Sequence, residues 1–364
     1  MDIFETLSAR NDATRTIKVV DMHTSGEPTR IVVGGYPELQ GTTLLEKRRC
    51  AKDRHDGIRQ RLMREPRGHA EMYGAILVPE TEYTQSGEAD IGVLFCHNEG
   101  YSTMCGHATI ALGRFLVDTH DQSIFPRRAS LKYDPSTGLT ALRLHAPCGV
   151  VHVNLPRCAQ LRHRPDLDVE IPPSLRWPRL CEAQRTSVRV DVSYGGAFYA
   201  LVSAAELGFA EGLSGRAGAT MADFDAATAA LKTVLGPRKE LFVHPTERDL
   251  EFLYGVMVVE RTAQGEAGLC FFADQQVDRS PCGSCVMARV ALAFEKGDLK
   301  LGQARDYESI VSLSVDGTGF RGTAVEKTEA GLIVQVQGKA FYSGASTFVV
   351  EDEDAMPSGF IVSL

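Results

Sequence analysis

Two cysteine-glycine pairs stand in matching surroundings in the two halves of this 364-residue chain. Cys105-Gly106 and Cys282-Gly283 each follow an apolar, strand-like run and a short turn, and each precedes an apolar run with helical character. A thiol at the start of a helix lies beside unpaired backbone N–H groups and the positive end of the helix dipole, which favour the thiolate. Two such thiols, one from each half, could serve as base and acid on opposite faces of one carbon. The pattern predicts proton transfer with inversion at that carbon.

The residues around the two thiols indicate what a substrate would carry. A glycine after each cysteine lets a ligand approach the backbone, and the N–H groups of a helix start bind a carboxylate. Asp278, on the turn that enters the second helix, could pair with a substrate ammonium, although a turn aspartate that complements the helix dipole fits equally well. His107 could contact substrate or cap its helix. His23 follows a strand and precedes a turn, which suits a pocket wall, but a hydrogen-bonded structural histidine is the simpler interpretation.

A C-x-x-C pattern formed by Cys282 and Cys285 could alternatively indicate a zinc or redox site. No second C-x-x-C and no pair of histidines at ligand spacing accompanies it, and Cys285 falls inside the apolar helix. We therefore expect Cys285 to be a core thiol and expect no metal. Free cysteines are commonly buried and inert, and this interpretation is applied to Cys50, Cys96, Cys148, Cys158, Cys181 and Cys270.

The elements that must position these residues are mostly short strands. The two helices after the cysteine-glycine pairs are apolar on nearly every side, which is typical of a buried helix. We therefore predict an α/β fold in which strands wrap around one central helix in each half. A further, amphipathic helix is predicted after Thr220, with Asp223 completing the cap and Gly236-Pro237 ending it.

The chain length fits two domains. The Pro- and Arg-rich stretch 156–186 is the better candidate for a boundary. We expect a first half over 1–185, completed by a returning segment 346–364, and a second half over 186–345. The active site is expected in the cleft between them.

Composition narrows the class of protein. Hydrophobic content of 43% and charged content of 24% are typical of a globular protein. A net charge of -8 without a basic block argues against a nucleic-acid partner. No apolar run approaches the roughly 20 residues of a membrane span. Nine cysteines without a secretory signal indicate reduced thiols and a cytoplasmic location. A homodimer is the default expectation for such a protein.

Five segments together resemble the proline racemase family, and the resemblance covers nearly the whole chain. They are 20–28 (VDMHTSGEP), 65–69 (EPRGH), 97–107 (HNEGYSTMCGH), 194–199 (YGGAFY) and 278–284 (DRSPCGS). The resemblance implies a diaminopimelate epimerase-like α/β fold of two pseudo-symmetric halves, each with a barrel-like sheet around a central helix. It also implies catalysis without pyridoxal phosphate, metal or any other cofactor, on a proline-type small molecule.

By that resemblance, Cys105 and Cys282 match the two catalytic positions. Asp278 matches a residue near the substrate nitrogen. His23 and the aromatic residues of 194–199 would lie near the pocket. The positions whose backbone groups hold the substrate carboxylate are matched by Gly106, His107, Gly283 and Ser284.

The family contains racemases, epimerases and dehydratases, which differ at the second catalytic position. Racemases and 4-hydroxyproline epimerases carry Cys there, whereas trans-3-hydroxy-L-proline dehydratases usually carry Thr or Ser. Cys282 therefore favours a cofactor-independent racemase or epimerase of proline or hydroxyproline. Other segments of the sequence, such as 72–75 (MYGA) and 252–255 (FLYG), resemble those of the eukaryotic dehydratases. A hydro-lyase that gives pyrroline-2-carboxylate is therefore the alternative. A binding protein without turnover is a third alternative, which the presence of both thiols disfavours.

Overall fold

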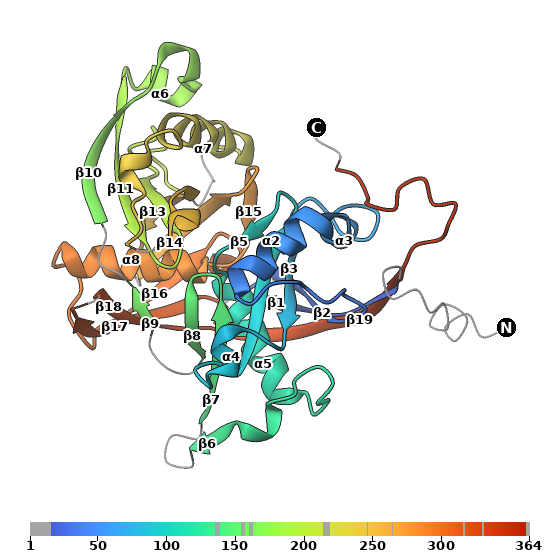
Figure 1. Cartoon of the computed structure of the whole chain (residues 1–364). Helices are drawn as coiled ribbons and strands as arrows, with labels where there is room; N and C mark the ends of the chain where they lie inside the picture. The colour runs from blue at the N-terminus through green and yellow to red at the C-terminus, as the bar shows by residue number, and fades with distance from the viewer. Residues whose placement is uncertain are drawn as a thin grey trace. The chain divides into compact units, whose positions relative to one another are not determined.

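The structure is a computed structural model that describes residues 16–134, 139–153, 157–159, 163–213, 219–245, 247–263, 265–315, 317–329 and 331–361. The chain divides into two compact units. Unit 1 comprises residues 1–155 and 339–364, and unit 2 comprises residues 156–338. Each unit is built around its own sheet (Figure 1).

The described residues of unit 1 form a nine-stranded sheet in the order β19-β1-β2-β3-β4-β7-β6, with β5 paired to β4 and β8 to β7. Its strands are β1 (Thr16–Thr24), β2 (Glu27–Gly34), β3 (Tyr73–Val78), β4 (Ile91–His97), β5 (Tyr101–Ser102), β6 (Lys132–Asp134), β7 (Leu139–Ala146), β8 (Gly149–Val153) and β19 (Ala340–Val349).

The described residues of unit 2 form a ten-stranded sheet in the order β10-β11-β12-β13-β14-β16-β17-β18-β9, with β15 paired to β14. Its strands are β9 (Arg157–Ala159), β10 (His163–Glu170), β11 (Ser187–Tyr194), β12 (Phe198–Ser203), β13 (Leu253–Arg261), β14 (Gly265–Phe272), β15 (Gln276–Asp278), β16 (Ala304–Ser309), β17 (Phe320–Thr328) and β18 (Gly331–Gln337).

The two sheets share one topology. In unit 1, β2 runs parallel to β3, β3 antiparallel to β4, and β4 parallel to β7. In unit 2, β12 runs parallel to β13, β13 antiparallel to β14, and β14 parallel to β16. A short strand, β5 or β15, pairs with the third of these strands (β4 or β14) and precedes a long helix. The predicted fold of two pseudo-symmetric α/β halves is confirmed.

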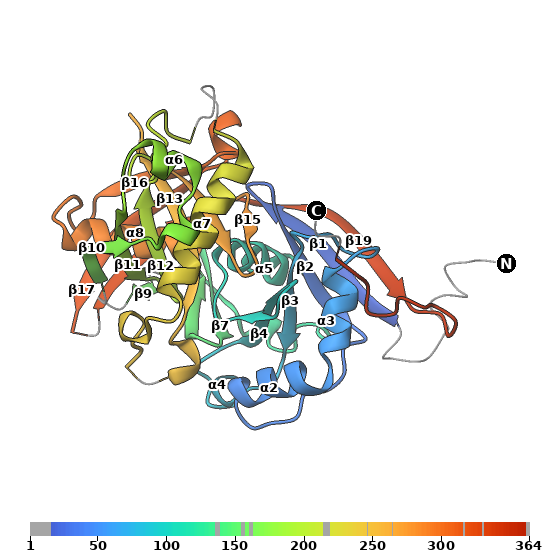
Figure 2. The ribbon, with the colours of Figure 1, turned by 90° about the horizontal axis from the view of Figure 1, so that it is seen from above.

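The helix that follows each short strand is enclosed by its own sheet. Helix α5 (Gly106–Asp118) packs on β1, β2, β3, β8 and β19, and Figure 2 shows it among the strands of unit 1. Helix α8 (Gly283–Glu295) packs on β9, β11, β12, β17 and β18. In α8 every residue from 283 to 293 is buried. The apolar residues all round these helices are the reason, since only an enclosed helix removes every side from water.

Further helices pack on the core clusters of the two sheets. In unit 1, α2 (Leu44–Arg54) and α3 (Asp56–Met63) pack on a core cluster with residues of β1 to β4, and α4 (Glu82–Gln85) is one short turn. In unit 2, α6 (Pro178–Glu182) and α7 (Met221–Leu235) cover the cluster formed by β10 to β14. The short 3₁₀ segments are η1 (Arg128–Ser130), η2 (Pro173–Leu175), η3 (Lys239–Leu241), η4 (Arg248–Leu250) and η5 (Ser312–Ser314).

The helix expected after Thr220 is confirmed as α7. Thr220 accepts from the backbone N–H of Asp223, and the Asp223 side chain accepts from the backbone N–H of Thr220, which is a capping box. Gly236 follows its last residue.

The division between the units falls at 155/156, whereas the sequence suggested 185/186. The difference arises because β10, which lies inside the Pro- and Arg-rich stretch, pairs antiparallel with β11 of unit 2. The returning segment starts at residue 339 instead of 346, since β19 pairs with β1 from Ala340 to Val349. Figure 1 shows β19 beside β1.

Among the described residues, no helix combines the length and the apolar character that crossing a bilayer requires.

Candidate active site

In unit 1 the structure brings Cys105, Gly106 and His107 together at the start of α5. Cys105 is the N-cap residue, and its Sγ accepts from the backbone N–H of Ala108 at 3.4 Å. The ring of His107 lies on the same sulfur, with Nδ1 at 3.3 Å and Nε2 at 3.5 Å. An imidazole and a helix N-terminus beside one sulfur both stabilise its thiolate. A thiolate in such an arrangement can act as a base in proton abstraction.

Neighbouring strands fix the position of His107. Thr24, the last residue of β1, donates its hydroxyl hydrogen to the His107 carbonyl oxygen at 2.9 Å. The ring of Tyr73 on β3 meets the His107 ring edge-on, with 4.8 Å between centroids. His107 is only 2% exposed, so its ring has little freedom to leave the sulfur.

His23 lies one residue before Thr24 on β1. Its ring stacks on Phe341 of β19 with 5.6 Å between centroids, and its Nδ1 accepts from the backbone N–H of Gly26 at 3.4 Å. These contacts agree with the structural interpretation of this histidine. Its place in a pocket wall stays a prediction.

In unit 2 the structure brings Asp278, Cys282, Gly283 and Ser284 together on the turn that enters α8. Cys282 is the N-cap residue and has φ 62°, a backbone conformation that non-glycine residues rarely adopt. Such a conformation costs about 1–3 kcal/mol and persists where the surroundings impose it. Cys282 N–H donates to Ser280 Oγ at 3.1 Å, and Val286 N–H donates to the Cys282 carbonyl at 2.7 Å.

Asp278 supports this turn. Its Oδ1 accepts from the backbone N–H of Ser280 at 2.8 Å, and Ser280 in turn holds the Cys282 backbone. Asp278 is buried, with 3% exposure. These hydrogen bonds agree with the turn interpretation of this aspartate, and its contact with a substrate nitrogen stays a prediction.

Tyr199 and Cys270 also contact the Cys282 sulfur. The Tyr199 hydroxyl lies 3.6 Å from Cys282 Sγ and 2.6 Å from Ser284 Oγ. Cys270, on β14, makes a side-chain hydrogen bond with Cys282, which together with burial raises the pKa of the Cys270 thiol. The interpretation of Cys270 as an inert core thiol missed this contact. The alternation of apolar and polar residues along a strand does not reveal which residue the Cys270 side chain contacts.

The turn between β11 and β12 contains Gly195, and its packing explains why the 194–199 segment has a glycine at this position. A Cβ on Gly195 would lie 2.1 Å from the Ser284 carbonyl oxygen and 2.6 Å from Ala288 N. Only glycine allows this turn to pack against the first turn of α8. Gly195 thereby brings the start of β12, with Tyr199, next to Cys282.

Cys285 lies inside α8 and is fully buried. Burial, followed by the neighbouring Cys282, raises the pKa of its thiol. A buried thiol that holds its proton fits the expected core role.

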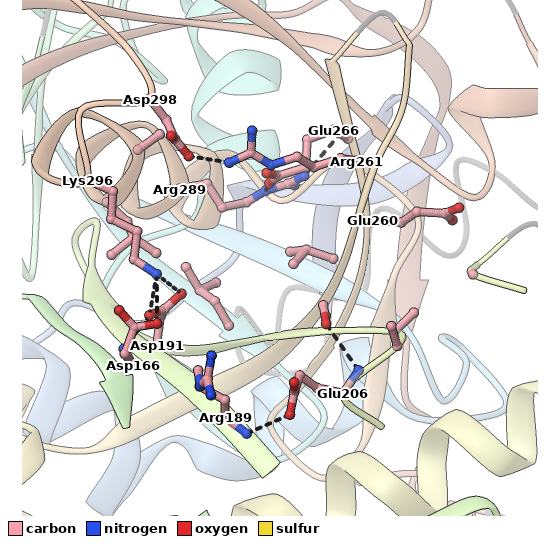
Figure 3. A pocket seen from close by; sticks show the side chains of 18 of the residues that line it. Asp166, Arg189, Asp191, Glu206, Glu260, Arg261, Glu266, Arg289, Lys296 and Asp298 are labelled. Carbon is pink, nitrogen blue, oxygen red and sulfur yellow. Dashed lines mark hydrogen bonds and ion pairs between the residues drawn. The ribbon is translucent and has the colours of Figure 1, made fainter. Parts of the chain in front are cut away.

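Unit 2 also contains a charged cavity of about 460 Å³ (Figure 3). Its charged residues largely pair with one another: Lys296 with Asp191 at 2.8 Å, Arg289 with Glu266 at 2.5 Å, and Arg261 with Asp298. Leu292, Ala293 and Lys296 place it at the carboxyl end of α8, whereas Cys282 stands at the amino end. None of the predicted site residues lines this cavity.

The fold matches solved structures of amino-acid racemases and epimerases. A probable proline racemase from Agrobacterium radiobacter, with bound carbonate, superposes with a TM-score of 0.76 at 22% identity over 95% of this chain and 96% of that one. A hydroxyproline epimerase from Agrobacterium vitis, with bound trans-4-hydroxy-L-proline, gives a TM-score of 0.74 at 20% identity over 96% of both chains. At this identity the likeness defines the fold class.

Sequence comparison identifies the family. The family model described as proline racemase matches residues 19–361. A human trans-3-hydroxy-L-proline dehydratase is 41% identical over 98% of this chain and 97% of its own length. A bovine trans-L-3-hydroxyproline dehydratase is 42% identical over 96% of this chain and 95% of its own length. The chain belongs to the proline racemase family, as its motifs indicated.

Proposed function

We propose that this protein is a dehydratase of trans-3-hydroxy-L-proline. The sequence favoured racemisation or epimerisation, with dehydration as the alternative, and the comparisons support the alternative better. The relatives named as dehydratases match at 41–42% identity over nearly the full chain, whereas the racemase and epimerase structures match at 20–22%. The observation that carries the proposal is the Cys105–His107 pair at the start of α5, which supplies the single base that dehydration needs.

Binding is assigned to the backbone of the two helix starts. The N–H groups of Gly106 and His107 in unit 1, and of Gly283 and Ser284 in unit 2, hold the substrate carboxylate. Asp278 pairs with the ring nitrogen. This assignment requires both half-sites to act on one substrate.

The reaction starts at the α-carbon. The Cys105 thiolate takes the α-proton, the electrons of the broken C–H bond form a C2–C3 double bond, and the C3–O bond breaks. In trans-3-hydroxy-L-proline the α-hydrogen and the 3-hydroxyl lie on the same face of the ring, because both are opposite the carboxylate. The Cys105 thiol can therefore return its proton to the leaving hydroxyl, which departs as water. The resulting enamine takes a proton at C3 and loses the proton on nitrogen, which gives the imine pyrroline-2-carboxylate.

A second candidate, racemisation or epimerisation, is favoured by one observation. Cys282 places a thiol at the start of α8, the position that Cys105 occupies on α5. In this reaction one sulfur removes the α-proton and the other supplies a proton to the opposite face. No hydroxyl leaves, and the substrate is proline or 4-hydroxyproline.

Product analysis with three substrates separates the two candidates. The protein is incubated in D₂O with L-proline, trans-4-hydroxy-L-proline or trans-3-hydroxy-L-proline. The mixture is then reduced with borodeuteride and analysed by chiral chromatography with mass spectrometry. Dehydration yields deuterated proline from trans-3-hydroxy-L-proline alone. Inverted proline or 4-hydroxyproline with deuterium at the α-carbon, and no trapped imine, would contradict the proposal and establish the second candidate.

The Cys282→Thr variant provides a matched control. Under the proposal it retains dehydration within a few-fold, because Cys105 both removes and returns the proton. Under the second candidate it loses roughly 10²-fold or more of its racemisation rate, since threonine does not supply that proton.

A further inference from the structure

The Tyr199 hydroxyl bridges two groups at the start of α8. Its oxygen lies 2.6 Å from Ser284 Oγ and 3.6 Å from Cys282 Sγ. The side chain comes from β12 and is fully buried, with 0% exposure. The hydroxyl is therefore shielded from bulk solvent.

The hydroxyl of Tyr199 keeps its proton. Burial, followed by the neighbouring Cys282, raises the pKa of Tyr199 well above its ordinary value. A neutral phenol carries one hydrogen and can donate it to one partner at a time, while its oxygen accepts from another. The hydrogen therefore points either at the Cys282 sulfur or at the Ser284 oxygen.

The charge on sulfur decides between these two arrangements. A thiolate attracts the Tyr199 hydrogen, because charge-assisted hydrogen bonds are the stronger ones, and Ser284 then donates to the phenol oxygen. A neutral thiol instead donates its own hydrogen to the phenol oxygen, and Tyr199 donates to Ser284. In both arrangements Cys282, Tyr199 and Ser284 share two hydrogen bonds, and only their direction changes.

We propose that Tyr199 is a positioning residue whose hydroxyl hydrogen follows the charge on Cys282, so that this sulfur is stable both as a thiol and as a thiolate. The inference rests on the proposed function only in placing Cys282 at a substrate, and it holds for either reaction. It goes beyond that function, in which Cys105 handles the α-proton, by giving Cys282 a means of taking and returning a proton without rearrangement of the core, as the second candidate reaction requires.

The partners of the two sulfurs differ. Cys105 meets an imidazole and a backbone N–H, which both favour the thiolate. Cys282 meets the neutral hydroxyl of Tyr199 and the thiol of Cys270. The groups around Cys105 therefore favour a thiolate, whereas the exchange of the Tyr199 hydrogen applies to Cys282 alone.

The test measures the two sulfurs separately. Wild type and Tyr199→Phe are treated with iodoacetamide between pH 6 and pH 10. The alkylation rates of Cys105 and Cys282 are read from their peptides by mass spectrometry. Loss of one charge-assisted hydrogen bond should raise the midpoint pH of Cys282 alkylation by about one unit, and so slow its alkylation at neutral pH about tenfold. The midpoint of Cys105 in the same samples should not move.

Tyr307→Phe is the matched control. Tyr307 is another fully buried tyrosine of unit 2, with its ring 4.6 Å from the Arg289 guanidinium. The Tyr307→Phe variant also loses a buried hydroxyl, but the midpoint pH of Cys282 alkylation should stay at the wild-type value. An equal shift in Tyr307→Phe, an equal shift at Cys105, or an unchanged Cys282 midpoint in Tyr199→Phe would each overturn the proposal. So would a wild-type Cys282 that is never alkylated, since it would not form a thiolate.

Failure of the proposed role of Tyr199 and failure of the proposed function give different results. Alkylation is measured without substrate and does not depend on turnover. If Tyr199→Phe shifts the Cys282 midpoint but the protein turns over none of the three substrates, the result supports the role of Tyr199 and contradicts the proposed function. Turnover of trans-3-hydroxy-L-proline with an unshifted midpoint does the reverse.

Discussion

At the scale of single residues, the two cysteines are placed alike and surrounded differently. Both are N-cap residues of buried helices, but Cys105 has an extended backbone with φ -143° and Cys282 a left-handed one with φ 62°. Cys105 caps its helix through sulfur, whereas Cys282 makes no side-chain capping bond. The two cysteines are therefore not structurally equivalent.

Cys105→Ser should reduce kcat/KM for trans-3-hydroxy-L-proline by roughly 10²–10⁴-fold, because a hydroxyl at that position is a far weaker base than a thiolate. Cys282→Ser, the matched change in unit 2, should cost much less. Steady-state kinetics with imine trapping measures both. A larger loss in Cys282→Ser than in Cys105→Ser would reverse the assigned roles.

Asp56 provides a pH-dependent contribution to stability. It receives two hydrogen bonds from the buried Arg59 guanidinium, at 2.6 and 2.8 Å. Burial alone would raise the pKa of Asp56, but the hydrogen bonds and charge of Arg59 outweigh it, and the pKa is lowered. A lowered folded-state pKa stabilises the fold above the unfolded pKa of about 4, and the contribution is lost as pH falls through the folded value.

Asp56→Asn should therefore lower the free energy of unfolding by about 2 kcal/mol at neutral pH. The difference from wild type should shrink as pH falls below about 4. Urea denaturation at several pH values measures it. Asp53→Asn on the exposed side of α2 is the control and should show neither effect. A difference that stays constant down to the lowest pH would contradict the ion-pair explanation.

At the scale of elements, tertiary enclosure is common to α5 and α8, whereas α7 begins with a local capping box. Helices α5 and α8 are enclosed by strands, while α7 packs on the core cluster of unit 2. The cap satisfies backbone N–H groups that the first helical turn leaves unpaired.

Thr220→Ala should lower the free energy of unfolding of the protein by about 1 kcal/mol and leave its activity unchanged. The physical reason is the loss of one hydrogen bond to the backbone of Asp223. Thermal unfolding and an activity assay test the two parts. Thr233→Ala, at an exposed interior position of the same helix, should be close to neutral. An equal loss in both variants would show that the cap is not responsible.

At the scale of the whole molecule, unit 1 depends on both ends of the chain. β1 lies between β2 and β19, and β19 is supplied by the last part of the sequence. Unit 2 is one continuous segment. Unit 1 can therefore be completed only after unit 2 has been synthesised.

A chain that ends at Gly338 should lose protection in unit 1 and retain it in unit 2. Without β19, β1 becomes an edge strand and α5 loses one of its packing partners. Hydrogen–deuterium exchange should show fast exchange in 16–24 and slow exchange in α8. A chain that ends at Glu351 keeps β19 and is the control. Equal protection of β1 in both chains would contradict a structural role for the returning strand.

The sequence by itself determined what local pattern controls. Duplicated cysteine-glycine pairs before helices apolar on every side indicate buried helices with a thiol at each start, because burial follows from composition around the helix axis. Thr220 and Asp223 specify the start of α7 because a capping box is formed within four residues. The segments shared with the proline racemase family determined the fold and the family.

Only the tertiary structure decided which residues surround each sulfur. Tyr199 is 83 positions from Cys282, and Cys270 lies on a different element, so their contacts depend on strand register and on the packing of Gly195 against α8. The same holds for β10, whose Pro- and Arg-rich sequence suggested a boundary until its pairing with β11 placed it in unit 2. Long-range pairing is set by the burial of complete faces, and no local window contains that information.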